Sequence, residues 1–217
     1  IVGDLADLEM MYSFKSFFEK CLGSKNLECR HDGIYINPNE RINYIFNSSI
    51  NGIENSDLTG QQAPLLQEAT TYIAHLPIRS RGTIGGSLAN ADPAAEYPAV
   101  ALALDFVFVV QSVRGERRIK AADFFEDILT TALQPDEMLT EVIVPKIPIN
   151  SGTAFVEIAK RHGDFALAGA AAQISFENGS PSDTRLAVCG AGPTAKRLTM
   201  AEEIILRDGV GPNAIKA

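Results

Sequence analysis

The sequence predicts an α+β fold, with a mixed α/β part followed by a small antiparallel sheet that ends in a helix. Three observations favour it. Helical patterns and a glycine-rich run occupy residues 64–104. Strand-like segments joined by tight turns fill most of residues 106–189. A last helical pattern covers residues 199–207. Helices that come first and consecutive strands that come later are typical of α+β rather than of alternating α/β architecture.

The first 50 residues contain three predicted elements. Apolar residues recur at helical spacing over residues 5–22, and Gly23 is suited to end that helix. Residues 27–36 are typical of a hairpin that turns at Asp32-Gly33. Residues 41–50 are expected to form a short helix. The chain begins with Ile1 rather than methionine, which suggests a fragment or a processed chain.

Helices are also predicted on both sides of the glycine-rich run. Residues 51–62 are polar and are expected to form a surface loop. Pro64 begins a helix whose apolar residues continue to Leu76 at a spacing of 3.6. After the glycines, Asp92-Pro93 resembles a helix N-cap followed by proline at the first helical position. A second helix is expected from Pro98 to Leu104, because proline does not continue a helix without loss of a hydrogen bond.

The second half of the chain is predicted to be mainly strands. Arg114-Gly115 forms the turn of a first hairpin, and Asn178-Gly179 marks a later tight turn. In the terminal helix, Ala201, Ile204 and Ile205 are expected to face inward. The predicted strands cover residues 106–112, 116–120, 138–145, 153–161, 165–176 and 185–189.

Composition limits the classes of function. The 217 residues carry 19 basic and 27 acidic side chains, so a net charge of −8 disfavours nonspecific nucleic-acid binding. No apolar stretch is long enough for a membrane span. Cys21, Cys29 and Cys189 lack metal-ligand spacing, and their odd number suggests reduced thiols in a cytoplasmic protein. Cys189, in an apolar run, is expected to fill the core. No metal site is predicted.

The run from Arg79 to Glu96 is the strongest candidate for a binding site. Three of its residues, Gly82, Gly85 and Gly86, allow a ligand to approach the backbone closely. Consecutive amides in such a loop can form a concave nest that binds phosphate. The run therefore suggests a pyrophosphate-binding loop, although a tight connection between strands would use the same glycines.

The motif Arg-Gly-Thr-Ile-Gly-Gly-Ser-Leu-Ala-Asn-Ala-Asp-Pro-Ala-Ala-Glu at residues 81–96 resembles a flavin loop of one protein family. This family is the FAD-binding medium subunit of molybdenum hydroxylases, of the xanthine dehydrogenase and aerobic carbon monoxide dehydrogenase type. Further matching motifs follow in order, at residues 121–125, 130–133, 136–142, 160–166 and 190–194. The resemblance implies a FAD-binding α/β portion of the type called PCMH, followed by a domain like the C-terminal domain of the carbon monoxide dehydrogenase flavoprotein.

The resemblance also implies a function and partners. A large molybdopterin subunit would oxidise the substrate, and a small subunit with [2Fe–2S] clusters would relay electrons to FAD on this chain. FAD would then reduce NAD, a quinone or oxygen. No catalytic nucleophile or base is expected, because the cofactor supplies the redox chemistry. The cofactor-binding residues implied by the matching motifs are Thr83, Ile84, Gly85, Gly86, Ser87, Asn90, Glu96, Leu139, Val156 and Asp164.

The N-terminal part departs from the family pattern. The family holds FAD between two glycine loops, and residues 1–60 contain only isolated glycines. We therefore divide the chain into an atypical or incomplete N-terminal region (1–60), a FAD-binding α/β domain (61–145) and a C-terminal domain of an antiparallel sheet and a helix (146–217). Two alternatives remain open at this point: a flavin-free docking scaffold of such a complex, and an unrelated domain that binds another phosphate ligand.

Overall fold

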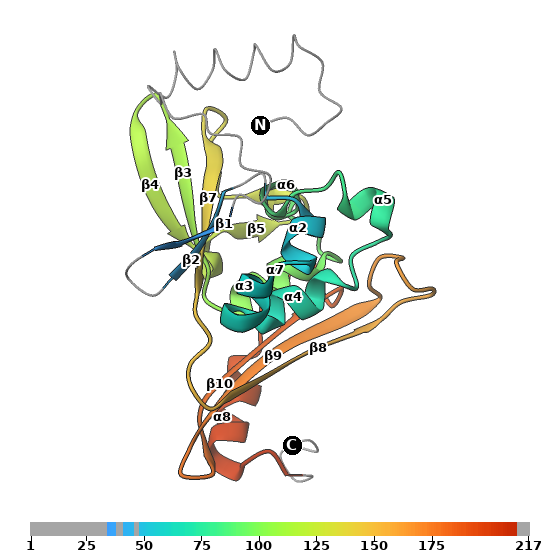
Figure 1. Ribbon diagram of the computed structural model, residues 1–217, viewed down its shortest axis with the longest axis vertical. Coiled ribbons are helices and arrows are strands. Elements are labelled where there is room, and N and C mark those ends of the chain that lie inside the picture. Colours follow the sequence, from blue (N-terminus) through green and yellow to red (C-terminus); the bar gives the residue numbers. More distant parts are fainter. Residues whose placement is uncertain (1–33, 38–40, 46–47, 212–217) are drawn as a thin grey trace.

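The computed structural model describes residues 34–37, 41–45 and 48–211. The predicted helix at residues 5–22 and the predicted turn at Asp32-Gly33 lie outside these ranges, as do Cys21 and Cys29. Within them, the α+β class is confirmed, since two antiparallel sheets are packed with short helices (Figure 1).

The first sheet has five antiparallel strands in the order β1-β2-β7-β3-β4. The predicted helix at residues 41–50 is wrong, because Arg41–Ile45 forms strand β2. Its sequence, Arg-Ile-Asn-Tyr-Ile, alternates between polar and apolar residues with the period of a strand. The predicted hairpin around Arg114-Gly115 is confirmed. The strands are β1 (Ile34–Asn37), β2 (Arg41–Ile45), β3 (Val107–Ser112), β4 (Gly115–Lys120) and β7 (Met138–Pro145).

Short helices connect β2 to β3. They are α2 (Ile50–Glu54), α3 (Asp57–Gln62), α4 (Pro64–Thr70), α5 (Leu76–Arg79), α6 (Ile84–Asn90) and α7 (Glu96–Ala103). After β4 come a 3₁₀ turn, η1 (Ala121–Asp123), and a small pair of strands, β5 (Phe125–Asp127) and β6 (Thr130–Thr131).

The predicted surface loop at residues 51–62 is wrong, because α2 and α3 occupy it. Ser49 caps the first helix, accepting a hydrogen bond from the Gly52 amide at 2.9 Å. Ser56 caps the second and accepts from the Thr59 amide at 3.2 Å. These caps satisfy amides that a helix N-terminus otherwise leaves unpaired, which offsets the polar composition of the segment.

The helix predicted to begin at Pro64 is confirmed, but it ends at Thr70 and Leu76 is 57% exposed. The helix predicted to begin at Pro93 is wrong. Asp92 instead accepts a hydrogen bond from the Ala94 amide in a turn, and α7 begins at Glu96. Pro98 lies in the first turn of α7, where an amide has no acceptor within the helix, so proline is tolerated there.

The second sheet has the order β11-β10-β9-β8 and is also antiparallel. Asn178 and Gly179 both have positive φ, which confirms the predicted tight turn between β9 and β10. The terminal helix α8 is confirmed, but Ala201, Ile204 and Ile205 are only half-buried and the buried residue is Glu202. The elements are β8 (Ser151–Ile158), β9 (Ala168–Glu177), β10 (Ser180–Cys189), β11 (Lys196–Arg197) and α8 (Thr199–Asp208).

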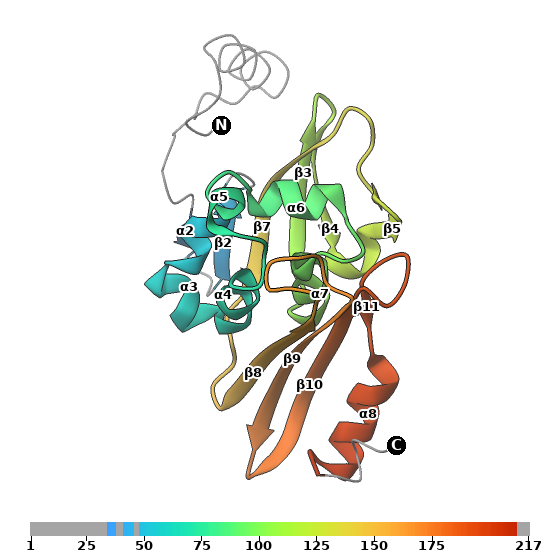
Figure 2. The ribbon, with the colours of Figure 1, turned by 90° about the vertical axis from the view of Figure 1, so that its right-hand side faces the viewer.

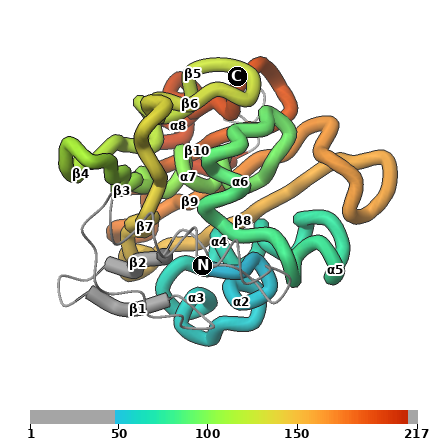
Figure 3. The backbone as a smooth tube through the Cα atoms, turned by 90° about the horizontal axis from the view of Figure 1, so that it is seen from above, coloured from blue at the N-terminus to red at the C-terminus, as the bar shows by residue number. Residues whose placement is uncertain are grey.

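Helix α7 holds the two halves of the described structure together. All its residues are buried, and it packs against α4, α6, β9 and β10 (Figure 2). The connection between β8 and β9 extends back toward α5, as Figure 3 shows from above. A cavity forms where this connection meets α6 and α7. No helix in the described ranges is both long and apolar enough to cross a membrane.

Candidate functional site

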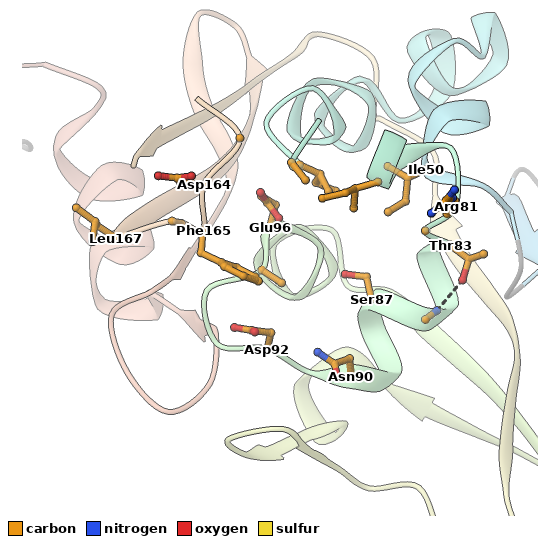
Figure 4. Close-up of a pocket in the computed structure, with 18 of the residues that line it drawn as sticks. Ile50, Arg81, Thr83, Ser87, Asn90, Asp92, Glu96, Asp164, Phe165 and Leu167 are labelled. Atoms are coloured by element: carbon orange, nitrogen blue, oxygen red, sulfur yellow. Dashed lines mark hydrogen bonds between the residues drawn. The ribbon is translucent and has the colours of Figure 1, made fainter. Parts of the chain in front are cut away.

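A cavity of about 1010 Å³ lies between the glycine-rich run, the start of α7 and the β8–β9 connection. Figure 4 shows Arg81 and Thr83 on one side, Asp164 and Leu167 on the other, and Glu96 between them. Its wall is formed by Ile50, Ile73, Ala74, Ile78, Arg81, Gly82, Thr83, Gly86, Ser87, Asn90, Asp92, Ala95, Glu96, Lys160, Gly163, Asp164, Phe165, Ala166 and Leu167. The volume is that of a site for a cofactor-sized ligand.

The glycine-rich run folds as the start of helix α6 rather than as an open loop. Thr83 is the N-cap, and its Oγ1 accepts a hydrogen bond from the Gly86 amide at 3.0 Å (Figure 4). The Ile84 amide donates to the Ser48 carbonyl at 3.0 Å, in a short bridge between residues 49 and 83. A Cβ on Gly86 would lie 2.9 Å from Thr83 Oγ1, so the tight cap requires glycine there.

The cap and the bridge use part of the amides expected to bind phosphate. The Ser87 amide donates to the Thr83 carbonyl, in addition to the two amides just described. Within the described part of the chain, no acceptor is recorded for the amides of Thr83 and Gly85. Between Thr83 and Ser87, the Thr83 amide is thus the one that has no acceptor among the described residues and also belongs to the cavity wall. Side chains would supply the other donors to a phosphate group.

The structure brings together most of the predicted cofactor-binding residues. Thr83, Gly86, Ser87, Asn90, Glu96 and Asp164 all line the cavity. Ile84 and Gly85 do not, because both are buried beneath the start of α6.

Two predicted residues lie away from the cavity. Leu139 is 3% exposed in β7, opposite Val110 of β3. Val156 is 62% exposed on β8, and neither side chain is part of the cavity wall.

The cavity also contains residues that the sequence reasoning missed. Arg81 and Lys160 line it as cations, and neither forms an ion pair with a described residue. Arg79, in contrast, is paired with Glu54 at 2.8 Å. Phe165 and Leu167, on the β8–β9 connection, are 71% and 55% exposed at the cavity. All four lie inside or beside the matching motifs, so proximity to a motif is the signal that could have identified them.

Glu96 is the most perturbed acid of the cavity. Its side chain comes from the first residue of α7 and is only 7% exposed. Burial raises the pKa of Glu96 to about 7, and the charges of Glu157 and Asp92 add to the shift. Burial also raises the pKa of Glu157, on β8. Near neutral pH the cavity therefore contains a carboxyl group that exchanges between its protonated and ionised forms.

Cys189 lies behind these carboxyl groups and confirms the expected core thiol. It is fully buried, and its burial together with Glu96 and Glu157 raises the pKa of the thiol to about 12. A thiol with so high a pKa is a poor nucleophile at neutral pH. Among the described residues, no group of three or more His, Cys, Asp or Glu side chains is arranged to hold a metal ion.

Comparison with family models identifies the two halves of the described structure separately. Residues 47–147 match the model "FAD binding domain in molybdopterin dehydrogenase", and residues 153–216 match "CO dehydrogenase flavoprotein C-terminal domain". Residues 1–59 match a third model, "Molybdopterin oxidoreductase". The cavity is thus built between regions that match two different models.

Individual relatives agree with these matches. The chain is 44% identical over 163 residues to the 6-hydroxypseudooxynicotine dehydrogenase complex subunit alpha of Paenarthrobacter nicotinovorans, covering 75% of this chain and 55% of the relative. It is 30% identical to the glyceraldehyde dehydrogenase medium chain of Sulfolobus acidocaldarius, covering 83% of this chain and 68% of the relative. The chain therefore spans little more than half of the first of these relatives.

A solved structure shows the same fold. A chain of carbon monoxide dehydrogenase from Hydrogenophaga pseudoflava aligns with a TM-score of 0.82 and 31% identity, over 85% of this chain and 64% of that chain. Quinoline 2-oxidoreductase from Pseudomonas putida 86 aligns with a TM-score of 0.75 and 29% identity, over 80% of this chain and 60% of that one. The chain belongs to the family of FAD-binding medium subunits of molybdenum hydroxylases, a family of oxidoreductase subunits of the carbon monoxide dehydrogenase and xanthine dehydrogenase type.

Proposed function

We propose that this chain binds FAD in the cavity and transfers electrons within a molybdenum hydroxylase complex. The observation that carries the proposal is the cavity itself, which collects six side chains and backbone positions implied by the family motifs: Thr83, Gly86, Ser87, Asn90, Glu96 and Asp164. Ile50 and residues 73–96 supply one wall, and residues 160–167 supply the other.

The chemistry of the cavity wall fits the parts of FAD. Arg81, the Ser87 hydroxyl and the free amide of Thr83 offer donors to a diphosphate. Phe165, Ala166 and Leu167 offer an apolar surface at the opposite side, suited to a flat aromatic ring. Between the two ends, Glu96 and Asn90 present polar groups to the hydroxyls of a ribityl chain.

When bound, FAD accepts and releases electrons singly or in pairs, and that chemistry belongs to the cofactor. The chain's own residues bind the diphosphate, orient the ring and keep water from its buried side. The proposed electron donor is a small subunit with [2Fe–2S] clusters, and the proposed acceptor is NAD, a quinone or oxygen. A large molybdopterin subunit would act on the primary substrate. We place the complex in the cytoplasm, where a free thiol such as Cys189 is usual.

The energetics limit how tightly this chain alone holds FAD. A charge-assisted hydrogen bond contributes about 1.5–3 kcal/mol. The Thr83 amide, the Ser87 hydroxyl and Arg81 would therefore contribute about 5–9 kcal/mol, against about 4–15 kcal/mol for the cost of association. Burial of the ring, or a contribution from a partner subunit, is needed for tight binding.

A flavin-free docking scaffold is the second candidate. The observation that favours it is the use of the Ile84, Gly86 and Ser87 amides inside the protein. Family membership excludes the third alternative, an unrelated phosphate-binding domain.

Titration with FAD tests the first proposal against the second. The wild-type chain is expected to bind FAD, with a change in flavin absorbance and quenched fluorescence. Gly86→Asp should lower the affinity by at least about 100-fold, because it adds a negative charge beside the diphosphate. Gly86→Asn is the matched control: it brings the same Cβ against Thr83 Oγ1 without the charge.

Circular dichroism of both variants checks that the fold is kept. Wild-type protein that binds no FAD would support the scaffold. Equal affinity of the Asp and Asn variants would contradict the position of the diphosphate.

A further inference from the structure

Two carboxyl groups from different parts of the chain meet beside the cavity. Glu96 comes from the start of α7 and lines the cavity, and Glu157 comes from β8 of the second sheet. Glu157 lies two residues from the buried Phe155, on the same face of the strand. The two side chains are near enough for a hydrogen bond when one of them holds a proton.

The surroundings leave the pair without a compensating ion pair. Oε2 of Glu157 is buried and has no hydrogen-bond partner among the described residues. Neither carboxyl forms a salt bridge with a cation of the described ranges. A buried acceptor without a partner is costly, and a proton shared with the neighbouring carboxyl removes that cost.

Other ionisable groups face the pair from three directions. Asp92 precedes α7 and acts on Glu96, and Cys189 of β10 lies behind both carboxyls. Besides the hydrogen bond to Glu96, Glu157 is attracted by the charge of His162, on the β8–β9 connection. Lys160, Asp164 and Arg81 line the same cavity. Asp92 and Cys189 are therefore acidic or neutral, and they do not stabilise a second negative charge on the Glu96–Glu157 pair.

We propose that Glu96 and Glu157 act as one unit that holds a single proton, and that binding of the flavin dinucleotide is accompanied by proton uptake at this pair. The inference rests on the proposed function for its ligand. Glu157 is a positioning residue: it keeps a proton on Glu96 by accepting its hydrogen bond, so that Glu96 presents an uncharged carboxyl group to the cavity.

The direction of the linkage follows from charge. Two neighbouring carboxyls cannot both ionise cheaply, so the second proton leaves at a higher pH than the first. The diphosphate of FAD brings two further negative charges into the cavity and makes that loss still less favourable. FAD affinity should therefore be constant at acidic pH and fall as the pH rises above the pKa of the pair. The largest slope for one proton is about tenfold per pH unit.

Calorimetric titration of the full chain with FAD tests the linkage. Titrations in two buffers with different ionisation enthalpies give the number of protons taken up on binding. Just above neutral pH, wild-type protein should take up about 0.3–1 proton per FAD. Glu157→Gln and Glu96→Gln should each reduce this uptake at least about threefold and flatten the pH dependence of the affinity. Glu203→Gln, an exposed change of the same charge on α8, should leave both unchanged.

Infrared difference spectra test the pair without FAD. Wild-type minus Glu157→Gln spectra at neutral pH should show the carbonyl band of a protonated carboxylic acid, and the band should vanish by about two pH units above the pKa of the pair. FAD binding without proton uptake would overturn the inference and leave the proposed function intact. Absence of FAD binding at every pH would overturn the proposed function and the linkage to it, and absence of the infrared band would overturn the pair itself.

Discussion

The carboxyl groups beside the cavity and those in the arginine clusters of this protein have opposite electrostatic surroundings. Glu96 and Glu157 lie beside the cavity without an arginine partner, and their pKa values are raised. Glu137, near the β3–β4 hairpin, accepts two hydrogen bonds from Arg117 at 2.6 and 2.7 Å. Arginine hydrogen bonds lower the pKa of Glu137 to about 2.

Glu202 of α8 is compensated in a similar way. It is 8% exposed, pairs with Arg197, and accepts a hydrogen bond from the Leu186 amide at 2.6 Å. Arg197 in turn bonds Asp105 and the Leu102 carbonyl, so this cluster fastens α8 and β11 to the end of α7.

The presence or absence of an arginine partner distinguishes carboxyl groups that stabilise the fold from carboxyl groups that are available to a ligand. Glu137, whose pKa the arginine hydrogen bonds lower, keeps its negative charge over the whole physiological range. A carboxyl group at a cavity that has no arginine partner has a raised pKa, and a ligand that binds beside it can change its protonation. Perturbed pKa values concentrate at functional sites for this reason.

The largest effect is expected for Glu202→Ala. Loss of the carboxylate leaves the half-buried Arg197 and the Leu186 amide without their shared acceptor, so the free energy of unfolding should fall by about 2–4 kcal/mol. Urea denaturation followed by circular dichroism measures it. The neighbouring exposed Glu203→Ala should change stability by less than about 0.5 kcal/mol. Equal effects of the two variants would show that the cluster of Glu202 and Arg197 does not fasten α8 and β11 to α7.

Glu96→Gln should have an effect of the opposite sign. The folded pKa of about 7 lies above the unfolded value of 4.5, so wild-type stability falls as the pH rises between these values. The variant should thus be more stable than wild type by about 1–3 kcal/mol at pH 8 and nearly equal to it at pH 5. Denaturation midpoints at both pH values measure the difference. A pH-independent difference would contradict the raised pKa.

Arg81→Ala should weaken FAD binding by about tenfold without a change in stability. The guanidinium lines the cavity and has no ion pair with a described residue, so it is available to a phosphate. Fluorescence titration with FAD measures the loss. Arg118→Ala, on the exposed strand β4, is the matched control and should bind FAD as wild type does. Riboflavin, which lacks the diphosphate, should not distinguish wild type from Arg81→Ala.

Glu137→Gln should have the smallest effect, a loss of about 1 kcal/mol at pH 7, because solvent screens a pair whose arginines are partly exposed. Its folded pKa lies below the unfolded value, so the contribution is complete above the unfolded pKa and is lost as the pH falls through about 2. Denaturation at pH 7 and pH 3 should show the difference between variant and wild type shrinking. A larger loss at pH 3 than at pH 7 would refute this account.

Some errors in the sequence reasoning concern signals that were present. Ser49 and Ser56 are capping residues placed directly before α2 and α3, and capping serines can be read from a sequence. The alternation of Arg41–Ile45 likewise favours a strand. These segments are short, and the polar composition of residues 51–62 dominated the prediction of a loop there. The strands of the second half were predicted better, because longer alternating runs end there at clear turns such as Asn178-Gly179.

Other features depend on distant parts of the chain. Leu139 and Val156 belong to well-predicted strands, yet which face each strand turns to the cavity depends on how the two sheets pack. Glu157 is an ordinary strand residue in the sequence, and only its position beside Glu96 makes it unusual.

The sequence by itself determined the family, the α+β class, and one wall of the cavity, because residues 81–96 form a continuous motif whose members stay neighbours in any fold. The tertiary structure alone decided which amides remain free, which cations reach the cavity, and which carboxyls share it. Burial and electrostatic interaction depend on distance in space, and α7 brings Glu96 to Glu157 across about 60 positions of chain.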